Sequence, residues 1–211
     1  IAGRINPPEY FKNCPVCDEE NSARHKETYW QRLHQIRGVE VCPVHSIFLE
    51  STNIRLGGLA RKYAFVTSQS AQRVTVAKKL EPENPEHRFL LRIAESAAWL
   101  LDKNVSRPGR VAISRRYRQV LTENDCLTRQ GWVRLARLRE KFGECCTPDL
   151  LMQFNCELRT GSDGGWLARL FRESGQAMAP LRHLAVMAML NVSAQEFFTP
   201  LLPESVRQPR Q

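Results

Sequence analysis

The sequence has no apolar run long enough to cross a membrane. A spanning helix needs about 18 or more consecutive apolar residues, and none of the 211 residues lies in such a run. The first residues also lack the basic and then apolar pattern of a secretory leader. We therefore expect a cytoplasmic protein with no membrane partner. The chain begins at Ile1 without an initiator methionine, so we expect it to be a piece of a longer protein.

The familiar motifs of catalysis are absent as well. No stretch resembles a nucleophile elbow, a phosphate-binding glycine loop or a paired-carboxylate site. The segment RTGSDGGW, residues 159–166, has glycines but neither the strand nor the lysine of a phosphate-binding loop. We therefore expect no enzymatic activity.

Acidic residues are in the minority. The chain has 22 Asp and Glu against 31 Lys and Arg, which gives a net charge of +9. Such an excess attracts polyanions, and nucleic acid is the first partner to consider, although solubility alone accounts for part of the charge. With 42% hydrophobic residues, the chain can bury at least one core and can divide into two domains.

The seven cysteines do not form a disulfide pattern. An odd number, arranged partly as Cys-x-x-Cys without an export signal, indicates metal binding instead. The segments CPVC and CPVH supply four ligands with the spacing of two zinc knuckles, and the proline after each cysteine suits the tight turn. A site with four protein ligands has no open position for water, so we predict one structural Zn²⁺ ion held by Cys14, Cys17, Cys42 and His45.

Other interpretations of this segment are open. The cysteine spacing can arise by chance in a reduced protein. His25 and Glu27 have the His-x-Glu form of zinc deaminases, but in those enzymes this pair precedes a Pro-Cys-x-x-Cys pair, and here the order is reversed. His34 can replace His45 as the fourth ligand, although a histidine there more often hydrogen-bonds its neighbours.

The remaining cysteines do not have knuckle spacing. Together with His183 they can build a second zinc site, but small buried thiols are the interpretation we favour, and we expect no second ion. These residues are Cys126, Cys145, Cys146 and Cys156.

Between the two knuckles, the apolar spacing predicts a short helix over residues 26–38. Tyr29, Trp30, Leu33 and His34 recur at helical intervals, and Gly38 can end the helix. We expect Trp30 to pack over the knuckles, because so small a module has little other core. A short strand should then lead into the second knuckle.

Beyond residue 80 the pattern predicts only helices. Asn84, Pro85 and Glu86 form a favourable opening for a helix that runs to about Lys103. Further helices are predicted over residues 113–121, 128–142, from 147, over 166–172 and over 180–190, with a capping box at residues 193–196. We therefore expect a mainly α fold. Residues 1–80 should form a small Cys₃His zinc-binding module with a short helix and minimal β structure. Residues 81–200 should form an all-helical domain that allows helix-turn-helix elements, followed by a loose tail over residues 201–211.

The knuckle segment resembles the zinc-binding segment of the TniQ/TnsD family of transposon target-selection proteins. The resemblance combines both knuckles with the Trp-centred stretch between them: CPVC, then YWQRLHQIRGV, then CPVH. A second similarity lies in WLARLFRESGQAMAPLRHLAVMAML and the following SAQEFF. Ser46 stands where the family usually has glycine, and we expect the family's region before the knuckles to lie outside this piece of the protein.

Basic side chains gather on two of the predicted helices. On the helix over residues 128–142, the apolar positions Trp132, Leu135, Leu138 and Phe142 are expected to face the core. A solvated face is the plainer interpretation of charge runs, but the net charge and the resemblance favour phosphate contacts. The candidate nucleic-acid-binding residues are Arg134, Arg137 and Lys141, with Arg115, Arg116 and Arg118 on the helix before.

The resemblance implies a protein that marks a transposon insertion site in the bacterial nucleoid. It implies that the protein binds double-stranded DNA or docks on a CRISPR RNA-guided complex, and recruits an AAA+ transposition ATPase and through it the transposase. Two rival interpretations are a zinc-stapled transcription regulator, which would bind its operator as a symmetric dimer, and a metal-dependent nucleic-acid enzyme, which would need an open coordination position.

Overall fold

A computed structural model describes residues 8–56, 66–103, 108–159, 165–171 and 178–201. The chain divides into two compact units, the first within Ile5–Ala98 and the second within Trp99–Gln211. The division falls inside helix α2 (Pro85–Asp102), whereas the sequence places a domain boundary before that helix, at residue 80. That placement stays a prediction.

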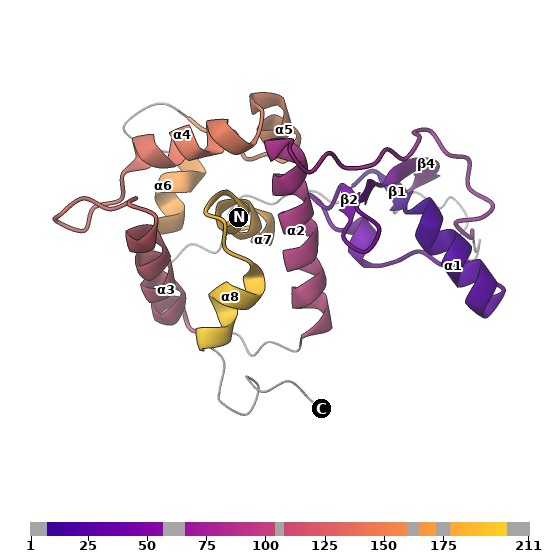
Figure 1. Ribbon diagram of the computed structural model, residues 1–211, viewed down its shortest axis with the longest axis horizontal. Coiled ribbons are helices and arrows are strands. Elements are labelled where there is room, and N and C mark those ends of the chain that lie inside the picture. The colour runs from indigo at the N-terminus through magenta and orange to yellow at the C-terminus, as the bar shows by residue number, and fades with distance from the viewer. Residues whose placement is uncertain (1–7, 57–65, 104–107, 160–164, 172–177, 202–211) are drawn as a thin grey trace. The chain divides into compact units, whose positions relative to one another are not determined.

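The described residues are mainly helical, which confirms the predicted fold class (Figure 1). None of their helices is both long and apolar enough to cross a bilayer. The helices are α1 (Pro15–His25), α2 (Pro85–Asp102), α3 (Arg110–Glu123), α4 (Leu135–Cys145), α5 (Pro148–Gln153), α6 (Gly165–Phe171), α7 (Pro180–Met189) and α8 (Ala194–Phe198), with 3-10 turns at Leu33–Gln35 and Thr199–Leu201. The strands are β1 (Tyr10–Asn13), β2 (Val41–Cys42), β3 (Ile47–Phe48) and β4 (Glu50–Arg55).

Two small antiparallel ribbons form the frame of the first unit. Strand β1 pairs with β4, and β2 pairs with β3 in a short hairpin. The chain returns along the free edge of the hairpin and of β4, where the Val74 N–H donates to the Ser51 carbonyl over 2.8 Å and the Phe48 N–H donates to the Lys78 carbonyl over 2.8 Å. The backbone of residues 72–79 is thereby fixed by strand-like bonds, which the weak apolar pattern of residues 46–80 does not predict.

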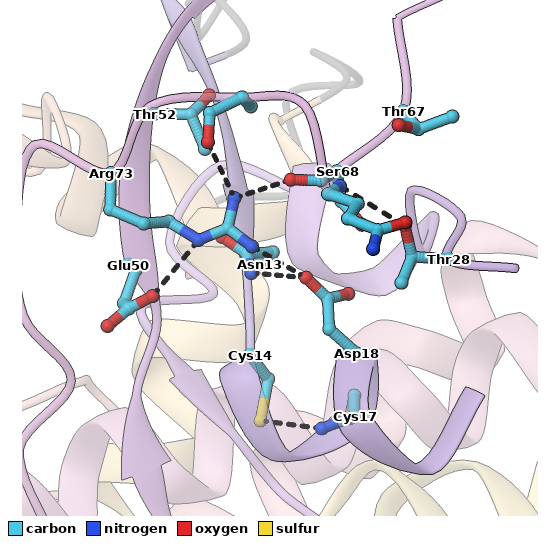
Figure 2. Close-up of polar contacts among 12 residues, drawn as sticks. Asn13, Cys14, Cys17, Asp18, Thr28, Glu50, Thr52, Thr67, Ser68 and Arg73 are labelled. Carbon is cyan, nitrogen blue, oxygen red and sulfur yellow. Dashed lines mark hydrogen bonds and ion pairs between the residues drawn. The ribbon is translucent and has the colours of Figure 1, made fainter. Parts of the chain in front are cut away.

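An arginine bridges two buried carboxylates in this unit (Figure 2). Arg73 lies 2.8 Å from the Asp18 carboxylate on α1 and 3.2 Å from the Glu50 carboxylate on β4. Asp18 also accepts a 2.7 Å hydrogen bond from the Asn13 side chain. Because both carboxylates are buried, this arginine neutralises charges that would otherwise be costly, and it ties the returning segment to α1 and β4.

The predicted helix over residues 26–38 is wrong. The helix of this region is α1, which begins directly after Cys14 and ends where Lys26 adopts a left-handed φ of 63°. After it, only the 3-10 turn at Leu33–Gln35 is helical. The Trp30 indole N–H donates to the Val66 carbonyl over 2.7 Å, and the ring lies 4.6 Å from the Phe11 ring on β1. Contacts distant in sequence therefore override the local helical spacing.

Helix α2 agrees closely with its prediction. The Asn84 side chain accepts from the N–H of Glu86 over 2.9 Å, which caps the start of the helix. Phe89, Leu90, Ile93 and Ala97 are buried, whereas Leu100 is only half-buried.

The second unit packs its helices around α7. This helix is buried along most of its length and contacts both α4 and α8 (Figure 1). Aromatic rings fill the surrounding core: Tyr117 lies 5.5 Å from Phe171 and 4.7 Å from Phe197. Thr147 caps α5, and the predicted capping box is confirmed, since Ser193 forms it with Glu196 at α8. Each such cap contributes about 1 kcal/mol to stability.

The predicted helix over residues 128–142 begins too early. Helix α4 starts at Leu135, and the preceding residues form a tight turn instead. The Thr128 N–H donates to the Trp132 carbonyl over 2.8 Å, and Gly131 has a φ of 82°, which a helix does not allow. Trp132 therefore does not face the core as predicted, and 71% of its surface is exposed. The predicted core positions Leu138 and Phe142 are buried.

Candidate metal centre and basic surfaces

The first knuckle is the start of helix α1. The Cys14 sulfur caps this helix and accepts from the N–H of Cys17 over 3.5 Å, while Pro15 takes the first helical position. Proline fits there because its φ is fixed and no N–H is needed in the first turn. The helix geometry then brings the Cys17 side chain to the same side as Cys14, as the CPVC motif predicts.

The second knuckle is the turn of the β2–β3 hairpin. Cys42 ends β2, and the Ser46 N–H returns to the Cys42 carbonyl over 2.9 Å. Ser46 has a positive φ of 52°, a conformation that glycine adopts more easily than other residues. The departure from glycine at this position is therefore accommodated by the turn at some cost in backbone strain.

The two knuckles bring four ligand atoms together. The three sulfurs and a ring nitrogen of His45 all lie within 4.8 Å of one another. His45 Nδ1 is 3.4 Å from the Cys14 sulfur, 3.3 Å from that of Cys17 and 3.6 Å from that of Cys42. The Cys17 and Cys42 sulfurs are 3.7 Å apart. The cysteines are buried and His45 is half-buried, so the group can hold a metal ion shielded from solvent.

Hydrogen bonds among the three thiols shift the pKa values of Cys17 and Cys42 in opposite directions. Hydrogen bonds from Cys14 and Cys17 lower the pKa of the Cys42 thiol well below its usual range. The hydrogen bonds with Cys14 and then Cys42 raise the pKa of the Cys17 thiol far above its usual range. A bound cation would stabilise all three thiolates.

Two further side chains orient the ligands. The ring nitrogen of His45 that faces away from the cysteines, Nε2, lies 3.1 Å from the Glu20 carboxylate. Burial opposes the charged form of the ring, but Glu20 and Cys42 together outweigh it and raise the pKa of His45. His34 is buried and hydrogen-bonds Cys42, and it is not among the four clustered ligands. Sequence spacing assigns no role to Glu20, which reaches His45 only through the fold.

The other cysteines lie in the second unit. Cys126, Cys146 and Cys156 are buried and Cys145 is half-buried. Within the described ranges, the cluster of Cys14, Cys17, Cys42 and His45 is the one place where three or more potential ligands converge. His183 instead pairs with Tyr117, whose hydroxyl lies 2.8 Å from Nδ1.

The arginines of α3 have different surroundings. Arg115 and Arg118 are exposed. Arg116 is half-buried: its guanidinium donates to the Glu196 carbonyl over 3.0 Å and lies 5.9 Å from the centre of the Phe197 ring. Arg116 therefore helps to hold α8 against α3.

The basic residues near α4 are mostly exposed. Arg134 stands just before the helix and lies 3.4 Å from the Asp125 carboxylate, while Arg137 lies 3.2 Å from Glu140. Lys141 is half-buried. Both ion pairs are solvent-exposed, and such pairs are weak enough for a phosphate to replace the carboxylate.

Comparison with known families assigns both parts of the chain. Residues 2–49, which contain the four clustered ligands, match the TniQ family model. Residues 93–206, more than half of the chain, match the model of TnsD, Tn7-like transposition protein D. A search of the curated proteins gives no match. The chain thus combines, in this order, a TniQ segment with a potential metal centre and a helical TnsD segment, and it belongs to the TniQ/TnsD family of transposition proteins.

Proposed function

We propose that this chain selects the target site for DNA transposition by binding double-stranded DNA through its helical unit and a transposition partner through its metal-stapled unit. The order of the two family matches carries this proposal: the segment with the four clustered ligands is TniQ-like, and the helical segment is TnsD-like. The chain divides into two compact units, so one chain can engage two partners.

We assign the metal as one structural Zn²⁺ ion. Three thiolates and one imidazole form a donor set that zinc prefers. In a tetrahedral zinc site, two sulfurs lie about 3.8 Å apart, and a sulfur and a nitrogen about 3.6 Å apart. The observed distance of 3.7 Å between the Cys17 and Cys42 sulfurs, and those of 3.3–3.6 Å from the sulfurs to His45 Nδ1, fit these values.

The zinc ion would stabilise the fold and would not catalyse a reaction. Four protein ligands leave no position for a substrate or a reactive water, so the site supports the role of a staple. It would join the start of α1 to the β2–β3 hairpin in a unit with few other regular elements. We accordingly propose a non-enzymatic adaptor.

The DNA-binding residues would be the exposed arginines of the helical unit. Arg115 and Arg118 on α3, and Arg134 and Arg137 at α4, present guanidinium groups to solvent. Arg116 and Lys141 would contribute less, because both are half-buried. These groups suit phosphate contacts, which hold a duplex without reading its sequence.

Recruitment completes the proposed mechanism. A chain that binds the target and also an AAA+ transposition ATPase raises the local concentration of that ATPase at the insertion site. The ATPase would then bring the transposase. A CRISPR RNA-guided complex can specify the insertion site in place of a DNA sequence, and the chain would recruit the ATPase there in the same way.

Selection from random duplex DNA tests the DNA-binding half of the proposal. Full-length protein is mixed with a random duplex pool, washed with increasing salt, and the retained DNA is sequenced. Enrichment of one asymmetric site identifies a direct reader of DNA sequence. Salt-sensitive retention of DNA without enrichment of any sequence identifies an adaptor that a partner directs to the insertion site. A lack of retention at low salt would contradict DNA binding.

A further inference from the structure

A short hairpin between α3 and α4 extends away from the helices of the second unit (Figure 1). Leu127 and Val133 form a single antiparallel bridge, and the backbones of Thr128 and Trp132 pair above it over 2.8 Å. The Thr128 hydroxyl also accepts from the Trp132 N–H over 3.1 Å. Gly131, with a φ of 82°, closes the turn. The tip is therefore a defined structure and not a loose loop.

Trp132 occupies this hairpin with 71% of its surface exposed. The other tryptophans are used differently: Trp166 is buried, and Trp30 and Trp99 are half-buried. An exposed apolar residue by itself is ordinary. A large aromatic ring held on an ordered, projecting turn is less so, because the turn needs no tryptophan for its backbone bonds.

Two exposed arginines accompany the ring. The Arg118 guanidinium lies beside Gly131, 3.9 Å from the position that a Cβ would occupy there. Arg129 is an exposed residue of the turn itself. Among the residues that the structure describes, neither arginine lies within ion-pair distance of a carboxylate. Arg134, at the base of the hairpin, has only the exposed, 3.4 Å pair with Asp125.

We propose that this hairpin is a nucleic-acid contact, in which Trp132 stacks on a base of the target DNA and Arg118 and Arg129 contact the flanking phosphates. The ring offers an apolar face to a base, and the guanidinium groups offer the opposite charge to the backbone on either side. Arginine and tryptophan are also enriched at protein–protein interfaces, so a protein partner is the alternative occupant. The net charge of +9, and the lack of an acidic partner for either arginine among the described residues, favour a polyanion.

This assignment rests on the proposed DNA binding and extends it to particular residues. Of the three hairpin-contact residues, only Arg118 belongs to the basic set predicted from the sequence. Arg129 is outside that set, and the sequence pattern places Trp132 in a helix core. A stacked ring requires that one base be partly unstacked from its neighbours. The hairpin would thus favour a duplex with a distorted or easily distorted step.

The test measures DNA affinity and tryptophan fluorescence with full-length protein and a random-sequence duplex. Trp132→Ala should weaken binding roughly ten-fold or more, as loss of one base–aromatic stack does, without changing the slope of affinity against salt. Arg118→Ala and Arg129→Ala should each reduce that slope by about one. DNA should quench the fluorescence of the wild-type protein, and the quenching should be largely lost in Trp132→Phe, which keeps a smaller stacking ring.

Met152→Ala is the matched control. Met152 is an apolar residue of α5 in the same unit with 55% of its surface exposed, so its removal changes exposed apolar area without touching the hairpin. It should bind DNA as the wild type does. All variants should keep the wild-type melting temperature, because none removes a buried side chain.

Two outcomes would overturn the assignment, and they are distinguishable. In the first, the wild type binds DNA, Trp132→Ala binds it equally well, and Trp132→Phe shows unchanged quenching. The hairpin then does not contact DNA, and a protein partner is the remaining candidate for its surface. If the wild type binds no duplex at any salt concentration, the proposed DNA binding itself fails, and the hairpin assignment fails with it.

Discussion

The His45 ring connects the cysteine cluster to a carboxylate: its Nδ1 lies 3.3–3.6 Å from the three sulfurs, and its Nε2 lies 3.1 Å from Glu20. A carboxylate that holds the second ring nitrogen fixes the orientation of the imidazole and raises its basicity as a metal ligand. Glu20 lies on α1, the helix that also carries Cys17. The same helix therefore carries both a potential metal ligand and the carboxylate that would orient another.

Removal of this carboxylate should weaken zinc binding without abolishing it. We expect Glu20→Ala to lower zinc affinity about ten-fold, at the low end for such groups because the Glu20 side chain is 62% exposed. Competition with a chromophoric chelator measures the affinity. Glu19→Ala removes an exposed carboxylate from the same turn and should leave the affinity unchanged. Equal affinities of the two variants would show that Glu20 does not orient His45.

Loss of one cysteine ligand should unfold the first unit. Cys42→Ala should lose most of its zinc, and amide hydrogens of residues 1–60 should exchange rapidly, because the metal staple contributes directly to folding. Cys145→Ala is the control, since this half-buried thiol lies outside the cluster and its removal should leave the zinc content at one ion per chain. A zinc-loaded, protected Cys42→Ala protein would refute the structural site.

The Arg73 bridge should matter far more than an exposed ion pair. Arg73→Ala leaves the buried Asp18 and Glu50 without their shared cation, and we expect the free energy of unfolding of the first unit to fall by about 2–3 kcal/mol. Arg55→Ala breaks a pair with Glu9 whose side chains are more than 60% exposed, and should have little effect. Chemical denaturation measures both. A similar small loss for the two variants would mean that the bridge adds no stability.

The second unit should lose stability in mild acid through His183. Burial lowers the pKa of this histidine in the folded state, so the unfolded chain binds the proton first. The contribution of neutral His183 is therefore complete above the unfolded pKa of about 6.5 and is lost as the pH falls below it. The melting temperature should fall less between pH 7.5 and 5 in His183→Gln than in the wild type. His25→Gln, at an exposed position, should behave as the wild type does.

The basic residues at α4 should contribute to the salt dependence of DNA binding. Arg134→Ala combined with Arg137→Ala should reduce the slope of log affinity against log salt by about two, because each phosphate contact releases about one counterion. An unchanged slope would mean that these residues are solvent-exposed charges that do not contact DNA phosphates. A double Arg24→Ala, Arg32→Ala variant, which removes two exposed positive charges from the first unit, has the same net charge and should leave the slope unchanged.

The ligand cluster could be predicted from the sequence because its geometry is largely local. Two residues between the ligands of each pair bring their side chains to one ion, and the prolines after Cys14 and Cys42 reinforce each turn. Most helices beyond residue 80 were predictable for a similar reason. Their caps at Asn84, Thr147 and Ser193 are formed within a few residues of the helix start.

The remaining features depend on contacts that the sequence pattern does not contain. The spacing of residues 26–38 is helical, but Trp30 bonds to Val66 and packs on Phe11, and the helix forms upstream instead. Trp132 fits a helical core pattern, yet Gly131 turns the chain before α4 begins. Glu20 gains its role only when α1 meets the β2–β3 hairpin.

The most direct test of the central claim maps insertions in cells that carry the complete transposon. Insertion sites are sequenced with the wild-type protein, with Cys42→Ala and with no protein. If the protein selects the target, insertions should be concentrated at one site with the wild type. They should be dispersed or lost with Cys42→Ala and with no protein. The same concentrated distribution without the protein would contradict its role in selecting the target.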